Sequence, residues 1–280
     1  MDGNLDSLRL RVPARCLRRN KNLRRGCQHD LDIFALGPIW QSAFARKQHG
    51  IALWFKHRHL PARQRQPQPV FLPIAAAEVR AGVAKQTFTL PSKVPLAGYS
   101  RRDGKPSRGV HDPVGVRALV IADGDTVVAV VSCDLLIIDE RLFRAVQRRL
   151  NAQVSAAPVA LVMAATHTHS GPGAYGRKFL EKLSMGHFDP LVFEALADQI
   201  TATIQRAAEG LQPVRLAYGR IMTEELVVNR VEPEGFVDPE LIVCALYGEA
   251  DAPLAVLVSF SAHPTTLGAW NMELSADYPG

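Results

Sequence analysis

With 280 residues, 47% of them apolar and 21% charged, the chain has the length and composition of a protein that buries a sizeable core. No apolar run approaches the roughly 18 residues that a membrane-spanning helix needs, which excludes a spanning segment. The formal net charge is +6, but residues 1–70 hold 14 of the 33 basic and 4 of the 27 acidic side chains. The remaining 19 basic and 23 acidic residues make the rest of the chain mildly acidic, which argues against nucleic-acid binding there.

Residues 1–72 form an Arg-rich leader without a sustained helical or alternating period. A secretory signal needs a continuous apolar stretch of about 7 to 15 residues, and none lies near Met1. We expect the leader to be disordered, or to be a non-native stretch translated from upstream of the true start. A targeting extension and a nucleic-acid-binding arm are the alternatives. The Pro-rich stretch 61–73 is its natural linker to a domain over residues 73–280. The four cysteines include no CxxC pair, so the cellular compartment stays open.

Strand and helix patterns alternate after the leader. In chain order, the expected elements are strands 116–123 and 126–136, a helix 139–153, a strand 159–165, a helix 190–209 and a strand 254–259. Gly124 marks a hairpin turn between the first two strands, and Asp189 and Gly210 should cap the second helix. The pattern predicts an α/β fold with a layered mixed sheet and flanking helices, whose strands are covered on both faces.

Three of these strands end in residues that can bind metals or transfer protons. Ser132 and Asp134 close one strand, the segment 166–170 (Thr-His-Thr-His-Ser) follows another, and Ser261 and His263 follow the last. Loops at the carboxyl ends of strands can aim side chains while the sheet holds them rigidly. We therefore expect the functional site where these three strands end.

The His-Thr-His sequence is the clearest chemical signal. If the segment stays extended, His167 and His169 point to one face and can serve one centre. Neutral imidazole is a common zinc ligand, and a catalytic zinc takes three or four protein ligands while one position stays open. A hydrogen-bonded structural residue is the alternative for each histidine, and it is the more frequent one for His263 taken alone.

Several motifs resemble, in order, those of the neutral/alkaline, non-lysosomal ceramidase family. They are "RAGVAKQTFTLPSKVPLAGYSRRDGKPSRGVHDPVGVRALVI", "VVSCDL", "ATHTHSGPG", "NRV", "SAHPTTLG" and "SADYPG", which together cover about residues 79–280. The most specific part is "THTHSGPG" followed at a distance by a strand that ends in "HP". The resemblance implies an α/β catalytic domain with one zinc ion, which hydrolyses the amide of ceramide to a fatty acid and sphingosine.

The resemblance also assigns roles to residues of this chain. It makes His167 and His263 zinc ligands, and His169 a histidine that faces the substrate and hydrogen-bonds the amide oxygen or passes a proton to the leaving amine. Arg230 resembles an arginine that lines the same pocket, with an ordinary loop arginine as the alternative. Asp134 and Asp277, in segments that match the family, are candidates for orienting an imidazole.

The family's remaining zinc ligands, a glutamate and a tyrosine, come later than Gly280. The expectation is therefore the N-terminal part of a ceramidase-like domain, incomplete at its C-terminus and inactive alone, with a lipid amide as substrate of the complete domain and peripheral contact with a membrane. A catalytically inactive relative that binds lipid or a partner is the main alternative. Nucleic-acid binding through the leader is the other. The sequence indicates no oligomeric state.

Overall fold

The computed structural model describes residues 32–36, 79–91, 93–153 and 159–280, all within the second of the chain's two units, Leu31–Gly280. The strands are β1 (Asp32–Leu36), β2 (Arg80–Thr87), β3 (Gly109–Val110), β4 (Gly115–Asp123), β5 (Thr126–Cys133), β6 (Ala160–Ala165), β7 (Gln212–Pro213), β8 (Arg215–Met222), β9 (Glu240–Tyr247), β10 (Pro253–Ser259) and β11 (Glu273–Leu274). The α-helices are α2 (Glu140–Gln153), α3 (Phe179–Met185) and α4 (Pro190–Glu209), and the 3-10 turns are η3 (Ser100–Arg102), η4 (Glu224–Leu226) and η5 (Glu249–Asp251).

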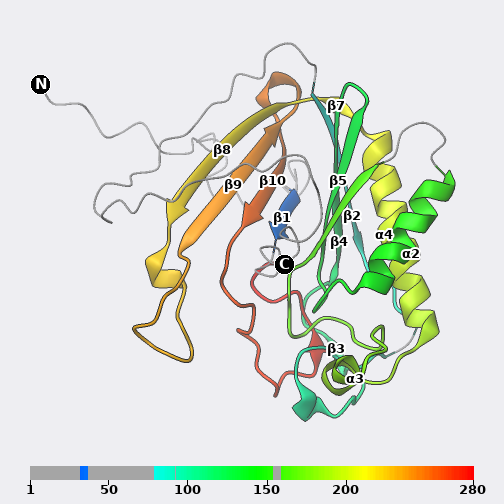
Figure 1. The fold of residues 1–280 in the computed structure, drawn as a ribbon, viewed down its shortest axis with the longest axis vertical. Helices are drawn as coiled ribbons and strands as arrows, with labels where there is room; N and C mark the ends of the chain where they lie inside the picture. The colour runs from blue at the N-terminus through cyan, green and yellow to red at the C-terminus, as the bar shows by residue number, and fades with distance from the viewer. Residues whose placement is uncertain (1–31, 37–78, 92, 154–158) are drawn as a thin grey trace, which may run out of the picture. The chain divides into compact units, whose positions relative to one another are not determined.

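Two larger sheets, one two-stranded sheet and a helical layer make up the described part of this unit (Figure 1). The larger sheet has the strand order β6-β5-β4-β2-β7 and is mixed, because β5 and β6 run parallel while β4 is antiparallel to β2 and β5. The smaller sheet has the order β1-β10-β9-β8, and β11 pairs with β3. The predicted α/β class with a layered mixed sheet is confirmed, and the structure adds the second sheet.

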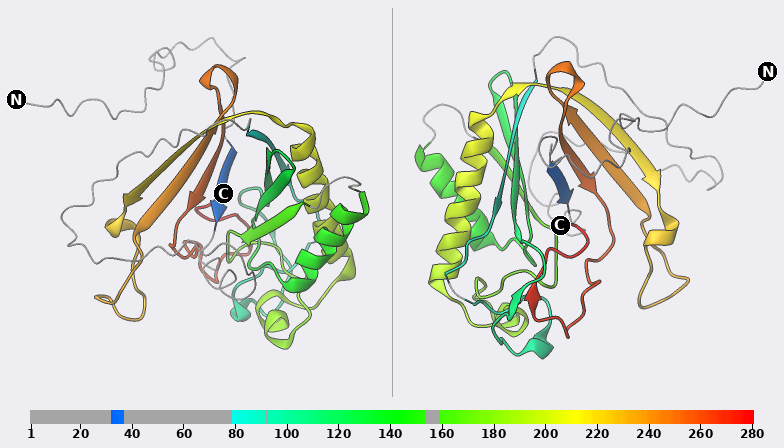
Figure 2. Two further views of the ribbon diagram at one scale, coloured as in Figure 1. Left: turned by 45° about the horizontal axis from the view of Figure 1, so that its top comes forward. Right: turned by 180° about the vertical axis from the view of Figure 1, so that it is seen from behind.

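The larger sheet is buried on both faces. Helices α2 and α4 cover one face, as the two views of Figure 2 show, and their apolar side chains join those of the strands in the main core. Leu142, Val146 and Leu150, spaced by four in α2, are all part of that core. On the other face, Leu119 of β4 packs with Leu246 of the smaller sheet. Helices thus cover one face and a second sheet covers the other.

The local signals in the sequence account for most element boundaries. The β4–β5 hairpin closes with Asp123 opposite Thr126, and Gly124 has a φ of 55°, where a side chain would cost energy. Asp189 accepts a hydrogen bond from Leu191 N at the start of α4, and Gly210 follows its end. Strand β5 stops at Cys133, three residues earlier than predicted, because the chain turns where Leu135 N bonds to Cys133 O at 2.8 Å.

Five leader residues form the strand β1, which runs parallel to β10 with Asp32 opposite Ala255 and Leu36 opposite Ser259. The rest of the leader and its Pro-rich linker lie outside the described residues, so their disorder stays a prediction. No helix in the described part of the chain combines the length and hydropathy needed to cross a bilayer.

Candidate metal centre

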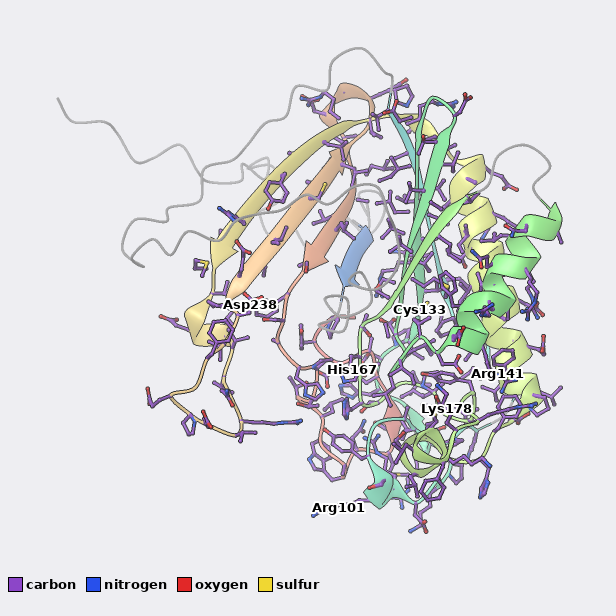
Figure 3. The ribbon with its side chains drawn as sticks, viewed as in Figure 1. Arg101, Cys133, Arg141, His167, Lys178 and Asp238 are labelled. Carbon is purple, nitrogen blue, oxygen red and sulfur yellow. The ribbon has the colours of Figure 1, made fainter. Side chains whose placement is uncertain are left out.

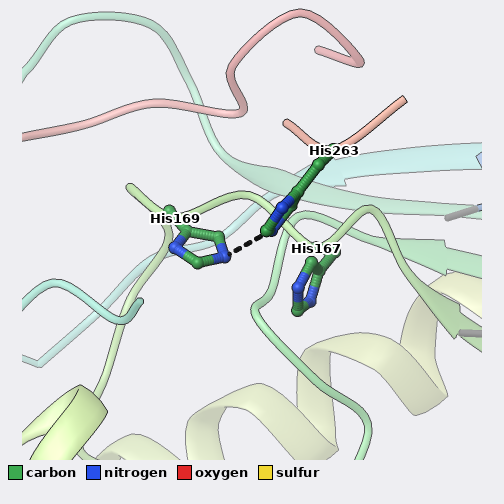
Figure 4. Close-up of side chains that lie close together, drawn as sticks. All are labelled: His167, His169 and His263. Carbon is green, nitrogen blue, oxygen red and sulfur yellow. Dashed lines mark hydrogen bonds between the residues drawn. The ribbon is translucent and has the colours of Figure 1, made fainter. Parts of the chain in front are cut away.

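Three histidines converge at one end of the two sheets. His167 and His169 lie in the loop after β6, and His263 lies beyond the end of β10 in the other sheet. Their ring nitrogens, one from each residue, all lie within 4.8 Å of one another. The rings of His167 and His263 are stacked, with centroids 4.9 Å apart, and His169 stands edge-on to both (Figure 4). The predicted convergence of β6 and β10 is what brings these side chains together.

His167, labelled in Figure 3, is held by hydrogen bonds to the loop after β5. His167 N donates to Leu135 O, and the ring nitrogen Nδ1 lies 2.6 Å from Leu136 O. Because a carbonyl only accepts hydrogen bonds, Nδ1 carries the proton and Nε2 keeps its lone pair free. A backbone carbonyl on the far nitrogen is the usual support of a metal-binding imidazole.

The His-Thr-His segment is not extended, contrary to the condition considered from its sequence. His167 has a φ of 66°, in the left-handed region that non-glycine residues seldom adopt. Thr166 N and His167 N both bond back to the loop after β5, at Cys133 O and Leu135 O, and these bonds turn the chain. The two imidazoles still meet, with centroids 5.0 Å apart, but through this turn rather than through strand alternation.

His169 is partly buried beside the rings of the other two histidines. Burial, followed by the nearby rings of His167 and His263, lowers the pKa of His169 to about 4. Its Nδ1 is buried without a hydrogen-bond partner among the described residues, while its Nε2 lies 2.9 Å from Nε2 of His263. A neutral ring with an unused nitrogen in a buried position is suited to accept an ion or a substrate group.

His263 and Arg230 meet on the side of the smaller sheet. Burial, with His167 and Arg230 next, lowers the pKa of His263, and Asp277 opposes that change. Arg230 is exposed, in the loop between β8 and β9, and its Nη1 lies 3.5 Å from Nδ1 of His263. The neighbouring Asn229 shapes this loop, because its side chain bonds to Val231 N and Phe236 O. All four predicted site residues therefore lie in one place.

The expected role of the two aspartates is wrong, because their oxygens contact other groups. Asp134 accepts hydrogen bonds from Gly115 N at 2.9 Å and from the Arg117 guanidinium at 3.1 Å. Asp277 accepts from Thr266 Oγ1 at 2.6 Å and from Leu267 N at 3.1 Å, in the loop that follows His263. Both carboxylates shape the loops near the cluster, and a backbone carbonyl orients His167 instead.

The segment 98–99, which no sequence pattern assigned to the site, packs directly on His169. A Cβ at Gly98, which has a φ of 109°, would lie 2.6 Å from His169 Cβ, so only glycine fits there. The Tyr99 ring lies 4.9 Å from the His169 ring. "PLAGYS" was part of the family resemblance, but nothing in its pattern assigned it to the site.

The donor set fits a zinc ion. The pKa values of His169 and His263 lie below their usual range, so both rings are neutral at pH 7, and metals bind the neutral imidazole. One ring nitrogen from each of the three imidazoles lies close enough to the others to be a candidate ligand of one ion, and neutral imidazole is a common zinc ligand. The carbonyl-supported Nδ1 of His167 agrees with this assignment.

Comparisons with known proteins agree with the sequence motifs. Residues 80–280 match the family described as "Neutral/alkaline non-lysosomal ceramidase, N-terminal". The chain is 32% identical over 219 residues to a neutral ceramidase of Pseudomonas aeruginosa, with 72% of this chain and 32% of that protein covered. It is 26% identical over 207 residues to a neutral ceramidase of Mycobacterium tuberculosis, covering 66% of this chain and 32% of the relative.

Solved structures give the same result. Two ceramidase structures, one described as "Ceramidase complexed with C2" and one of the neutral ceramidase from Pseudomonas aeruginosa, each match with a TM-score of 0.66 and 28% identity. Each match covers 72% of this chain and 34% of the solved chain. The chain thus spans about a third of the length of the relatives it matches. Because the family match extends over residues 80–280, the chain belongs to the neutral/alkaline non-lysosomal ceramidase family.

Proposed function

We propose that this chain carries part of the active site of a zinc-dependent amide hydrolase, which cleaves the N-acyl bond of ceramide or a related lipid amide to a fatty acid and a sphingoid base. The observation that carries the proposal is the convergence of three ring nitrogens, from His167, His169 and His263, within 4.8 Å. Family membership supports the reaction class, because the matched relatives are neutral ceramidases. The substrate and the activity belong to the whole protein. This chain matches about a third of the length of its relatives.

His167 and His263 would hold the zinc ion. Nε2 of His167 is free to bind, since its Nδ1 is engaged by Leu136 O. When bound in such a site, zinc lowers the pKa of a water molecule to about 7 and polarises a carbonyl oxygen. Two imidazoles are fewer than the three protein ligands of a typical catalytic zinc site, so at least one further ligand would have to join His167 and His263.

His169 and Arg230 would act on the substrate. As a neutral base, His169 can take a proton at Nε2 from the water that attacks the amide carbonyl, and then hand this proton to the nitrogen that leaves as the amine. Its low pKa in the free protein favours the neutral form, which also suits a hydrogen bond to the amide oxygen. Arg230, an exposed and permanent cation beside His263, can stabilise negative charge on that oxygen.

The test measures zinc content and cleavage of a fluorogenic ceramide. The product of the whole reading frame is compared with its His167→Ala and His263→Ala variants, and His187→Ala serves as control because His187 is exposed and lies outside the cluster. We expect one zinc ion and turnover in the parent and control, and loss of both in the two cluster variants. A parent that is inert and metal-free contradicts the proposal and favours an inactive relative that binds lipid or a partner.

A further inference from the structure

A buried arginine lies directly behind the His169 loop. Arg102, at the end of η3, is only 3% exposed. Its side chain presents five N–H donors in a planar fork, and the structure supplies an acceptor for each. Nε donates to Asn271 O at 3.0 Å; Nη1 donates to Ala97 O at 2.9 Å and His169 O at 2.5 Å; Nη2 donates to Ser170 Oγ at 3.4 Å and Gly268 O at 3.3 Å.

The five acceptors come from three separate segments of the chain. They are four carbonyl oxygens and one hydroxyl, contributed by Ala97, by the pair 169–170, and by the loop 268–271. Burial lowers the pKa of the Arg102 guanidinium, as expected for a cation removed from water. Burying a charge is costly unless its surroundings satisfy it, and these five bonds offset that cost.

The same segment forms the surface on which His169 rests. Gly98 touches the Cβ side of His169, Tyr99 lies beside its ring, and the Arg102 guanidinium lies 4.8 Å from the Tyr99 ring centroid. Asn271 Nδ2 also donates to Ser170 Oγ at 3.1 Å, which links the third segment to the His169 loop a second time. The backbone of His169 is therefore fixed from behind while its ring faces the other two histidines.

We infer that Arg102 is a positioning residue, which fixes the backbone of His169 and thereby sets the place of its ring in the histidine cluster. The inference rests on the proposed role of that cluster. Lysine cannot substitute, because an ammonium group has three donors on one atom and cannot reach three segments in one plane. An ordinary structural arginine would stabilise the fold without a specific effect on His169, and this difference can be measured.

The test compares Arg102→Lys with Arg149→Lys in the metal-free full chain. Arg149 is the matched control, because it also bridges separate segments, from α2 to Glu194 and Asp198 of α4, and none of these contacts involves the cluster. With histidine labelled by nitrogen-15, imidazole signals are recorded at one fixed pH and assigned with a His169→Gln sample. The readout needs no activity, so it can fail or succeed independently of the proposed hydrolysis.

We expect the His169 signal of Arg102→Lys to split or broaden, because the ring is no longer held in one position. The signal of His187, which is exposed, should stay unchanged. In Arg149→Lys both signals should match the parent, although both variants unfold at lower temperature. A His169 signal that keeps the parent position and width in a folded Arg102→Lys chain overturns the inference, as does an equal change in Arg149→Lys.

A milder variant covers the case in which Arg102→Lys does not fold. Ser170→Ala removes one acceptor of Arg102 and the link to Asn271, and leaves the four carbonyl bonds in place. We expect the same change in the His169 signal, smaller in size. If Ser170→Ala folds and leaves that signal identical to the parent, the inference is overturned.

Discussion

The two sides of the histidine cluster differ in how firmly they are held. On the side of the larger sheet, Thr168 and Ser170 are fully buried, and Thr168 Oγ1 donates to Ser275 O at 2.8 Å. On the side of the smaller sheet, Arg230 projects from a loop in which Val228, Val231 and Phe236 are all exposed. One side has the tight packing that fixes a ligand geometry, and the other has the exposure of a surface that meets a partner or substrate.

The contrast teaches where substitutions should act. On the buried side, groups such as Thr168 and Asp134 are hydrogen-bonded to other buried groups, so the loss of one leaves another without its partner. On the exposed side, water can replace a lost contact. Stability should therefore depend on the first side and substrate handling on the second.

Removing the buried carboxylate of Asp134 should give the largest loss of stability. Asp134→Ala leaves Gly115 N and the largely buried Arg117 without their partner, and breaking such a pair costs about 3–5 kcal/mol. Urea unfolding of the metal-free chain measures this loss. Asp134→Asn keeps an oxygen for Gly115 N and should cost less; equal stability of Asp134→Ala and the parent would show that the buried side is not held as described.

Removing a proposed metal ligand should come next. His167→Ala and His263→Ala should each weaken zinc binding by more than the roughly 100-fold, or about 2.7 kcal/mol, that a lost supporting hydrogen bond costs. Competition with a coloured chelator measures the affinity, and His187→Ala provides the unchanged reference. Parent-like affinity in either cluster variant would remove that histidine from the ligand set.

Acid should destabilise the metal-free chain through the cluster. The pKa of His169 is about 4 in the folded chain against about 6.5 for an unfolded histidine. Between pH 4 and pH 6.5 the folded state therefore binds fewer protons than the unfolded state. The contribution of His169 to stability is constant above about pH 6.5 and falls as the pH drops towards 4. The lowered pKa of His263 acts in the same direction.

Urea midpoints measured between pH 7.5 and pH 4 in the presence of a chelator check this dependence. His169→Gln should flatten the curve in that window, whereas His187→Gln should leave its slope intact. An unchanged slope in His169→Gln would mean that the ring is protonated in the folded chain.

The smallest effect on stability is expected at Arg230. Its side chain is exposed, so Arg230→Ala should change the free energy of unfolding by no more than about 0.5 kcal/mol. In the whole protein, the same variant should lower ceramide turnover, because the cation beside His263 is lost. A large loss of stability, or full turnover, would contradict the division between the two sides.

Local signals in the sequence were sufficient for much of the fold. Gly124 and its flanking strands predicted the hairpin, and Asp189, Pro190 and Gly210 marked both ends of α4, because caps and turns depend on neighbouring residues. In the larger sheet, β2 was not among the expected elements. Its polar positions at Lys85 and Gln86 break the apolar pattern that marked the other strands.

The site divides in the same way. The sequence by itself identified the candidate site residues, since His167, His169, His263 and Arg230 stand out by type and motif, and the structure brings all four together. Only the tertiary structure decided that His263 arrives from a second sheet, that His167 turns through a left-handed conformation, and that Arg102 supports His169 from behind. The physical reason is that these contacts join residues tens of positions or more apart, and no local pattern encodes a hydrogen bond between distant segments.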